Sequence, residues 1–180
     1  MDLPSNGVHS NGCSLVREIL EKEGLGFRDT APWDSSVKIG EGLLNPTRIY
    51  VKPCLAAHRK TLAKGMAHIT GGGLVENVPR MLPESLGAEI DVSTWTLPPV
   101  FRWLQKAGRV AAPEMARVFN NGIGMVLVVS AEDAQAAESV LKEFGESPVR
   151  IGSLTKRGEE ACVLKSLSSW NLPQEQQSVI

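Results

Sequence analysis

A triplet of glycines, Gly71, Gly72 and Gly73, most restricts how this chain can fold. It follows the short apolar run 65–70, which is typical of a strand. Residues without a Cβ let the backbone turn through positive φ and let its N–H groups approach an anion closely. The segment therefore predicts either a phosphate-binding turn or a tight turn after a buried strand, since glycine clusters end many strands without binding anything.

A second polar and glycine-containing segment, residues 5–12, stands directly before an apolar pattern that predicts a helix over 14–23. Ser10 or Asn11 is suited to cap this helix, and the unpaired N–H groups of its first turn favour anions. His9 is expected beside that helix end. The alternative is an ordinary loop histidine whose ring is satisfied by the backbone, because histidine titrates near neutrality in either case.

The rest of the chain alternates between strand and helix patterns, which predicts an α/β (α+β) fold with a mixed sheet covered by helices. Residues 25–45 lack periodicity and predict a long surface connection, whereas Pro53 predicts a break or a start within a helical segment over 46–62. The further predicted strands are 87–92, 123–129, 149–154 and 161–167, and the further helices are a turn over 77–82, one between Pro98 and Gly108, 113–119, and one between Ser130 and Gly145.

The composition is that of one ordinary domain, with 180 residues, 42% hydrophobic and 22% charged. The formal net charge is −1, so no long-range field attracts nucleic acid or an anionic membrane. Cys13, Cys54 and Cys162 are widely spaced, which indicates reduced thiols and a cytosolic location rather than a disulfide frame or a zinc site. No apolar run long enough for a membrane span and no signal-like segment is present.

Five segments of the sequence resemble the aminoimidazole ribonucleotide synthetases, also called phosphoribosylformylglycinamidine cyclo-ligases, of purine biosynthesis. The segments are LPSNGVHSNGCSLVREIL at 3–20, LLNPTRIYVKP at 43–53, GMAHITGGGLVENVPRMLPESLGAEID at 65–91, LPPVFRWLQKAGRV at 97–110 and EMARVFNNGIGMVLVV at 114–129. Their shared order is far more specific than a glycine motif alone. Selenophosphate synthetases and hydrogenase-maturation enzymes share the fold but not the HSNG and HITGGG sequence motifs, so membership of those families is disfavoured.

The resemblance implies that residues 1–165 form the partly ferredoxin-like C-terminal domain of the family, with residues 166–180 as a tail. An N-terminal domain, expected to be absent from this chain, would hold Mg²⁺ and most of the ATP contacts. The sequence looks most like that of a fungal bifunctional enzyme, in which the synthetase is fused to glycinamide ribonucleotide synthetase. A cytoplasmic homodimer is expected for the family, and the isolated chain is expected to be inactive.

The implied reaction is the ATP-dependent closure of formylglycinamidine ribonucleotide to aminoimidazole ribonucleotide, with ADP and phosphate as by-products. The family resemblance makes His9 the expected catalytic group, as hydrogen-bond donor or acid/base, with Ser10 and Asn11 orienting the substrate. No metal ligand is expected in this chain. The other candidate substrate-binding residues are Gly71, Gly72, Gly73, Asn77, Arg80 and His68.

Several candidates have structural alternatives. Arg80 can pair with Glu76 one helical turn away, and His68 can be a satisfied, semi-buried histidine in a strand. At Asn121 the family commonly has Cys or Met, which weakens any catalytic role there. His58 is expected on a solvated helical face. The alternative function for the whole chain is a non-catalytic module that binds phosphoribosyl ligands or associates with the parent enzyme.

Overall fold

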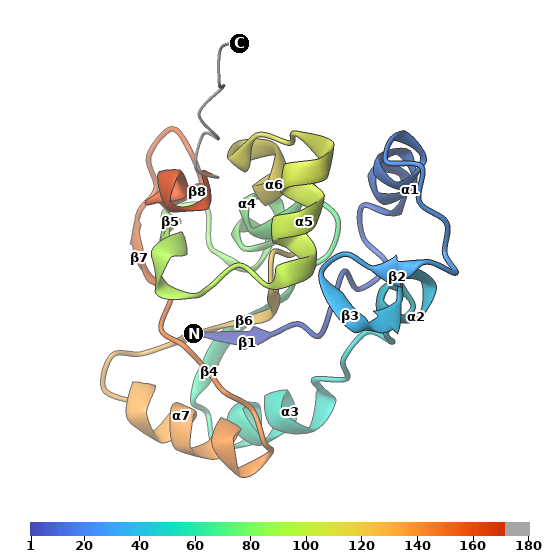
Figure 1. Cartoon of the computed structure of the whole chain (residues 1–180). Helices are drawn as coiled ribbons and strands as arrows, with labels where there is room; N and C mark the ends of the chain where they lie inside the picture. The colour runs from blue at the N-terminus through green and yellow to red at the C-terminus, as the bar shows by residue number, and fades with distance from the viewer. Residues whose placement is uncertain (172–180) are drawn as a thin grey trace.

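The computed structural model describes residues 1–171, and strand β6 (Ile123–Val129) lies at its centre (Figure 1). It pairs antiparallel with β1 (Asp2–Pro4) on one side and with β4 (Ala63–His68) on the other. The β6 sequence is apolar at nearly every position because both faces of this sheet are covered. The strand predicted over 123–129 is confirmed to the residue.

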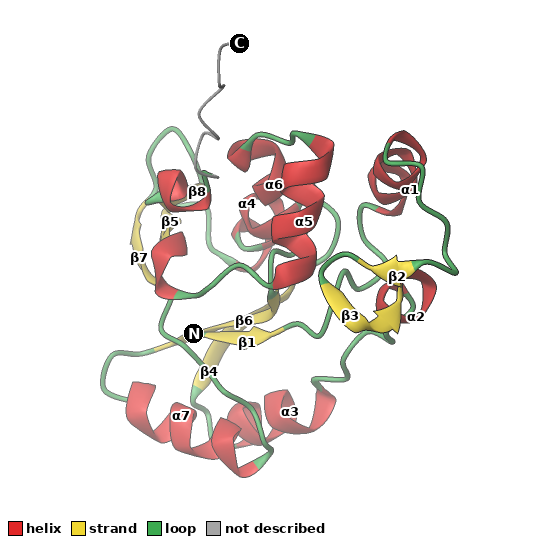
Figure 2. Ribbon diagram, viewed as in Figure 1, coloured by secondary structure: helices red, strands yellow, loops and turns green. Residues whose placement is uncertain are grey.

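One face of this sheet is covered by α3 (Val51–Arg59) and α7 (Ala134–Glu143), which lie together below the sheet in Figure 2. Pro53 lies in the first turn of α3, where a missing N–H removes no intrahelical bond, so the predicted helix start is correct. Before α7, the hydroxyl of Ser130 accepts the Asp133 N–H at 3.3 Å. The predicted helix between Ser130 and Gly145 is confirmed, but its N-cap is Asp133 without a side-chain cap, so the capping box predicted at Ser130 is wrong.

The opposite face packs against a second three-stranded sheet in the order β7-β5-β8. Strand β5 (Leu86–Asp91) pairs antiparallel with β7 (Gly152–Lys156) and parallel with β8 (Cys162–Lys165). This sheet is the mixed one, and the α/β class is confirmed, although the strands form separate sheets rather than one. Two short elements after the glycines, α4 (Gly73–Asn77) and the 3₁₀ turn η1 (Pro79–Met81), join the same core.

A third core lies among three helices: α1 (Cys13–Lys22), α5 (Pro99–Gly108) and α6 (Ala112–Val118). The rings of Phe101 and Phe119 lie 5.9 Å apart at its centre, and both are fully buried. The 3₁₀ turns η2 (Val92–Thr94) and η3 (Leu167–Trp170) close this core. Trp170 packs edge-on against Trp95 at 5.8 Å, so the packed structure continues beyond residue 165. Residues 172–180 of the predicted tail lie outside the described residues.

Two predictions near the N-terminus are wrong. Residues 25–45 form a hairpin, β2 (Thr30–Ala31) and β3 (Asp34–Lys38), followed by helix α2 (Ile39–Leu43), rather than a loop. Neither Ser10 nor Asn11 caps α1, because the cap position is Gly12 at φ 68° with no side-chain cap. A Cβ at Gly12 would overlap the Phe119 ring, so close packing and the left-handed backbone both require glycine there. Within residues 1–171, no helix is both long and apolar enough to cross a membrane.

Candidate functional site

The loop that carries His9 has an unusual backbone. His9 and its neighbour Ser10 both have left-handed conformations, with φ of 51° and 60°. For residues other than glycine such conformations cost of order 1–3 kcal/mol each and concentrate at functional sites. His9 is nevertheless buried, whereas Ser10 is exposed. The loop therefore holds one buried imidazole and one accessible hydroxyl in a strained turn.

The contacts of His9 all fall on one ring nitrogen, Nε2. Nε2 lies 2.5 Å from the side-chain oxygen of Asn6, and the tautomer of the ring sets which of the two atoms donates. The backbone N–H groups of Asn6 and Arg48 donate to the same nitrogen at 3.3 and 3.4 Å. Nδ1 is buried without a hydrogen-bond partner among the described residues. An unpaired buried polar atom is costly unless a ligand uses it.

The electrostatic surroundings keep the His9 ring neutral. Burial lowers the pKa of His9 below its ordinary value, and the nearby His68 and Arg48 lower it further. A neutral imidazole near pH 7 can accept a proton at its unprotonated nitrogen or exchange a hydrogen bond with a substrate. The site therefore has one group suited to acid/base work.

Tyr50 connects His9 to His68. Its ring centroid lies 6.3 Å from that of His9 and 6.1 Å from that of His68, and its hydroxyl donates to the carbonyl of Pro4 at 2.7 Å. His68 is exposed, and its ring makes no hydrogen bond to a described residue, so the semi-buried alternative is wrong. A hollow of about 470 Å³ adjoins these rings. It is lined by Arg48, Ile49, Tyr50, Val51, Cys54, Leu55, His58, Met66, His68 and Met125.

The glycine turn meets the His9 loop at Asn11. Asn11 donates to the carbonyl of His9 at 3.0 Å, and its side-chain oxygen lies 3.9 Å from where a Cβ on Gly71 would stand. The N–H groups of Gly71 and Gly72 have no acceptor within residues 1–171, whereas Gly73 donates to Thr70 at 3.0 Å. The two segments singled out in the sequence are therefore neighbours in space, with free backbone donors beside the loop.

The side chain of Asn77 holds the backbone of this turn by hydrogen bonds. Its buried amide donates to the carbonyls of Gly71 at 3.1 Å and Gly73 at 2.8 Å, and its oxygen accepts from Thr70 and from Arg80. These bonds leave the Asn77 side chain engaged with the protein itself. Asn77 thus positions the backbone donors of the turn.

Arg80 is shared between Asn77 and Glu76. Its guanidinium lies 3.7 Å from the Glu76 carboxylate, and both side chains are exposed, so this ion pair contributes about 0–1 kcal/mol. The predicted pairing with Glu76 is confirmed. The Glu76 carboxylate also lies close to Gly72, so Arg80 offsets a negative charge beside the turn.

Two asparagines before β6 fix the loops of the site. Asn120 is fully buried; its oxygen accepts from the Ser5 hydroxyl at 2.8 Å and from the Gly122 N–H at 2.9 Å, and its nitrogen donates to Gly7 at 2.9 Å. Asn121 adopts φ 52° and donates to two carbonyls at the end of α6. Both residues support the backbone around the His9 loop.

Sequence reasoning missed three residues of this site. Arg48 and Tyr50 stand at the start of the segment 46–62 that was predicted to be helical, and nothing local to them indicates that they face His9. Asn120 carried only the weak signal of a polar pair before a buried strand. His58 is exposed on α3, as predicted, although it also lines the hollow. No group of three or more His, Cys, Asp or Glu side chains suited to a metal occurs in the part of the chain described.

The fold thus consists of packed sheets flanked by helices, with a glycine turn and a histidine loop that meet at Asn11. A solved thiamine-monophosphate kinase from Stenotrophomonas maltophilia shares this fold over 91% of the chain and 49% of its own, at a TM-score of 0.58 and 16% identity. The family profile described as AIR synthase related protein, C-terminal domain, matches residues 2–165. The chain belongs to this family.

Curated relatives are considerably longer than the chain. The bifunctional purine biosynthetic protein ADE1 of Schizosaccharomyces pombe is 55% identical over 172 residues, which is 94% of this chain and 22% of the relative. A phosphoribosylformylglycinamidine cyclo-ligase of Neisseria meningitidis serogroup B is 52% identical over 161 residues, which is 89% of this chain and 46% of the relative. The bifunctional purine biosynthetic protein PUR2,5 of Pichia angusta is 47% identical over 167 residues, which is 92% of this chain and 21% of the relative. The chain therefore spans about half of the cyclo-ligase relative and about a fifth of each bifunctional one.

Proposed function

We propose that this chain is the C-terminal, substrate-side part of a phosphoribosylformylglycinamidine cyclo-ligase, which converts formylglycinamidine ribonucleotide and ATP to aminoimidazole ribonucleotide, ADP and phosphate. The observation that carries the proposal is the 52% identity to a relative of that name over 89% of the chain. The 55% and 47% identities to bifunctional purine biosynthetic proteins favour a fungal-type bifunctional parent. The domain is assigned to residues 1–165, and the family match over residues 2–165 supports this assignment.

The substrate phosphate is assigned to the glycine turn. The unpaired N–H groups of Gly71 and Gly72 support this assignment, since backbone donors in such a turn favour anions. Asn77 holds the turn in shape, and Arg80 adds a positive charge at its edge. His68 is assigned to a contact with the substrate across the hollow.

The reacting centre is assigned to His9. Its unpaired Nδ1 is the ring atom that remains available to hydrogen-bond the substrate nitrogen that closes the ring, or to exchange a proton with it. Ser10, exposed beside His9, and Asn11, which joins the loop to the glycine turn, would orient the substrate. Holding reactants in the correct orientation can remove a large part of the activation free energy of a reaction.

ATP and Mg²⁺ are assigned mainly to the part of the relatives that this chain does not match. The described side chains here offer Arg48 and Arg80 beside the site but no carboxylate cluster of the kind that holds Mg²⁺ with phosphates. When bound, ATP supplies the phosphoryl group that turns the amide oxygen into a good leaving group. The complete enzyme is proposed to be a cytoplasmic homodimer.

The test is co-expression of this chain with the segment that precedes the matched region in the Schizosaccharomyces pombe relative, followed by an assay for aminoimidazole ribonucleotide. We expect product only from the two parts together, and loss of product with His9→Ala. Arg59→Ala, at an exposed position on α3 that does not line the hollow, is the control and should retain activity. A well-folded complex that binds substrate but makes no product would instead favour the non-catalytic binding module.

A further inference from the structure

The turn after α7 places a carboxylate where an apolar side chain is usual. The N–H of Gly145, at φ 76°, donates to the carbonyl of Lys142 at 3.0 Å, and the N–H of Glu146 donates to that of Leu141 at 3.3 Å. These two bonds form a Schellman motif, in which the residue at the position of Glu146 usually makes an apolar contact with the last turn of the helix. The Glu146 side chain is only 3% exposed, so this position buries a carboxylate instead.

The stability of the fold does not account for this carboxylate. Its partner is Arg48, whose guanidinium lies 3.1 Å from Oε2 of Glu146. The contact lacks the geometry of a hydrogen bond, and Oε2 has no hydrogen-bond partner among the described residues. Replacing a buried ion pair by apolar side chains of similar volume is often neutral or stabilising. An unsatisfied buried carboxylate oxygen therefore needs another explanation.

Arg48 belongs to an irregular segment, residues 45–50, which lies against the loop that carries His9. The backbone N–H of Arg48 donates to Nε2 of His9 at 3.4 Å. The side-chain oxygen of Asn6 lies 2.5 Å from the same nitrogen, and the side-chain nitrogen of Asn6 donates to the carbonyl of Pro46 at 3.1 Å. The segment therefore contacts the imidazole directly and also holds the side chain that binds it.

Few contacts fix the position of segment 45–50. Of its residues, only Tyr50 is buried, and the hydroxyl of Tyr50 anchors that end by a backbone hydrogen bond. The side chain of Arg48 is anchored by its ion pair with Glu146. Because the segment has little apolar packing of its own, the place of the N–H that reaches His9 depends on this ion pair.

We propose that Glu146 is a positioning residue for His9. By holding the side chain of Arg48, it keeps segment 45–50 against the imidazole, so that Nε2 stays bound to the protein and Nδ1 stays available to the substrate. Glu146 acts through Arg48 and is therefore not a catalytic residue. The inference rests on the proposed function, in which His9 acts on the substrate.

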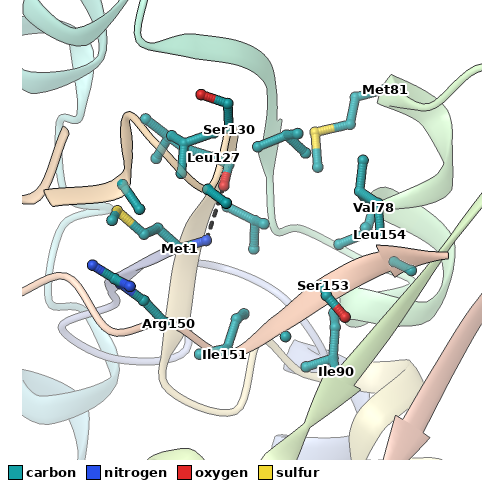
Figure 3. Close-up of a pocket in the computed structure, with 17 residues that line it drawn as sticks. Met1, Val78, Met81, Ile90, Leu127, Ser130, Arg150, Ile151, Ser153 and Leu154 are labelled. Carbon is teal, nitrogen blue, oxygen red and sulfur yellow. Dashed lines mark hydrogen bonds between the residues drawn. The ribbon is translucent and has the colours of Figure 1, made fainter. Parts of the chain in front are cut away.

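Glu138 offers a matched control on α7. It pairs with Lys142 at 2.7 Å and with Arg150 at 3.9 Å. Arg150 lines a separate hollow of about 430 Å³, to which β6 and β7 also contribute (Figure 3). Glu138 is therefore a paired carboxylate near the same turn, and its ion pairs do not involve segment 45–50.

The first test uses this chain alone and compares Glu146→Leu, which places an apolar residue at the turn, with Glu146→Gln, which keeps the shape without the charge. We expect hydrogen exchange at the Arg48 amide to become about tenfold faster in both variants. The imidazole nitrogen NMR signals of His9 should shift in both. The midpoint of thermal unfolding should not fall in Glu146→Leu, and Glu146→Gln repeats the comparison if Glu146→Leu alters the fold.

The second test places the same variants in the two-part enzyme described above. Because positioning acts on the reacting geometry, kcat should fall about tenfold while KM for formylglycinamidine ribonucleotide stays within about twofold. Glu138→Gln should change neither the kinetics nor the signals of His9.

Unchanged exchange at Arg48 and unchanged His9 signals in both Glu146 variants would overturn the inference. A loss of kcat that follows a lowered unfolding midpoint would also overturn it, because that result indicates a purely structural role. Failure of the proposed function would look different, since His9→Ala would then leave activity intact. The Glu146 variants would still shift the His9 signals in that case, which would support the positioning of the ring and refute its catalytic use.

Discussion

The guanidinium of Arg48 lies 3.1 Å from the carboxylate of Glu146, whose side chain is only 3% exposed. This ion pair joins the segment before α3 to the turn after α7. Burial raises the pKa of Glu146 above its ordinary value, and the charge of Arg48 partly offsets that effect. Since the Arg48 backbone N–H approaches His9, the pair also fixes one wall of the candidate site.

Arg48→Met should destabilise the chain by about 1–2 kcal/mol at pH 8, because it leaves Glu146 buried without a partner. The cost is below the roughly 3–5 kcal/mol of a fully buried pair, since a third of the Arg48 side chain is exposed. At pH 5 the loss should be smaller, because a carboxyl with a raised pKa takes up a proton more readily there. Urea unfolding at both pH values measures this. The double variant Arg48→Met/Glu146→Gln is the control, and a loss as large as that of Arg48→Met alone would contradict the explanation.

His9 should titrate below the ordinary histidine pKa of 6.5, because burial, His68 and Arg48 all disfavour its charged form. His68→Gln should raise the pKa of His9 towards its ordinary value by removing a neighbouring positive charge. A carbon-detected NMR titration of the imidazole signals measures the shift, and His58→Gln is the control because His58 is not among the groups that shift the pKa of His9. An unchanged His9 titration in His68→Gln would show that burial and Arg48 set its pKa without His68.

Substitution by alanine should have different effects on stability at the different glycines of the turn. At Gly73, with φ 57°, a Cβ would overlap the carbonyl of Ala116, so Gly73→Ala should cost more than about 3 kcal/mol or prevent folding. At Gly71 the nearest atom is the Asn11 oxygen at 3.9 Å, so Gly71→Ala should keep stability within about 1 kcal/mol. Its added methyl group would nevertheless shield the free N–H groups and weaken ribose 5-phosphate binding about tenfold. Thermal unfolding measures the effect on stability, and calorimetry measures the effect on ribose 5-phosphate binding. Unchanged binding in Gly71→Ala would show that the phosphate does not bind at this turn.

Asp2 makes the stability of this chain depend on pH. Burial raises the pKa of Asp2 from 3.8 to about 6, while its oxygen accepts the Val149 N–H at 2.9 Å. The folded state therefore binds the proton more tightly than the unfolded state, so stability falls as the pH rises from about 4 to 6. Asp2→Asn keeps the acceptor without the charge and should gain about 1–2 kcal/mol at pH 7 and nothing at pH 3.5. Urea unfolding checks this, and an equal change at both pH values would disprove the titration account.

The sequence predicted those elements whose apolar pattern is strong and local. Strand β6 and helices α1, α5 and α7 were found because buried residues recur at strand or helix spacing over at least seven positions. Strand β1 has only three residues, too few for a period. The hairpin β2–β3 is mostly polar, and it is anchored instead by Trp33, which packs 5.1 Å from the ring of Trp103 on α5.

The candidate site was predictable only where its residues carry a local signal. His9 and the glycine turn stand in segments whose composition is unusual, and their proximity through Asn11 agrees with a shared site. Arg48 and Glu146 are far apart in the chain, and nothing near either residue indicates the other. Their contact depends on how α3 and α7 pack, which one sequence read locally does not reveal.

The hydrogen bonds of Asn120 have a consequence for protein engineering. One amide holds Ser5, Gly7 and Gly122, so the shape of the histidine loop is encoded by a position more than a hundred residues downstream. Grafting residues 5–12 into another family member would therefore transfer the sequence of the loop without its conformation, unless the recipient has an asparagine at the position of Asn120. The loop and Asn120 form one exchangeable unit that is discontinuous in the gene.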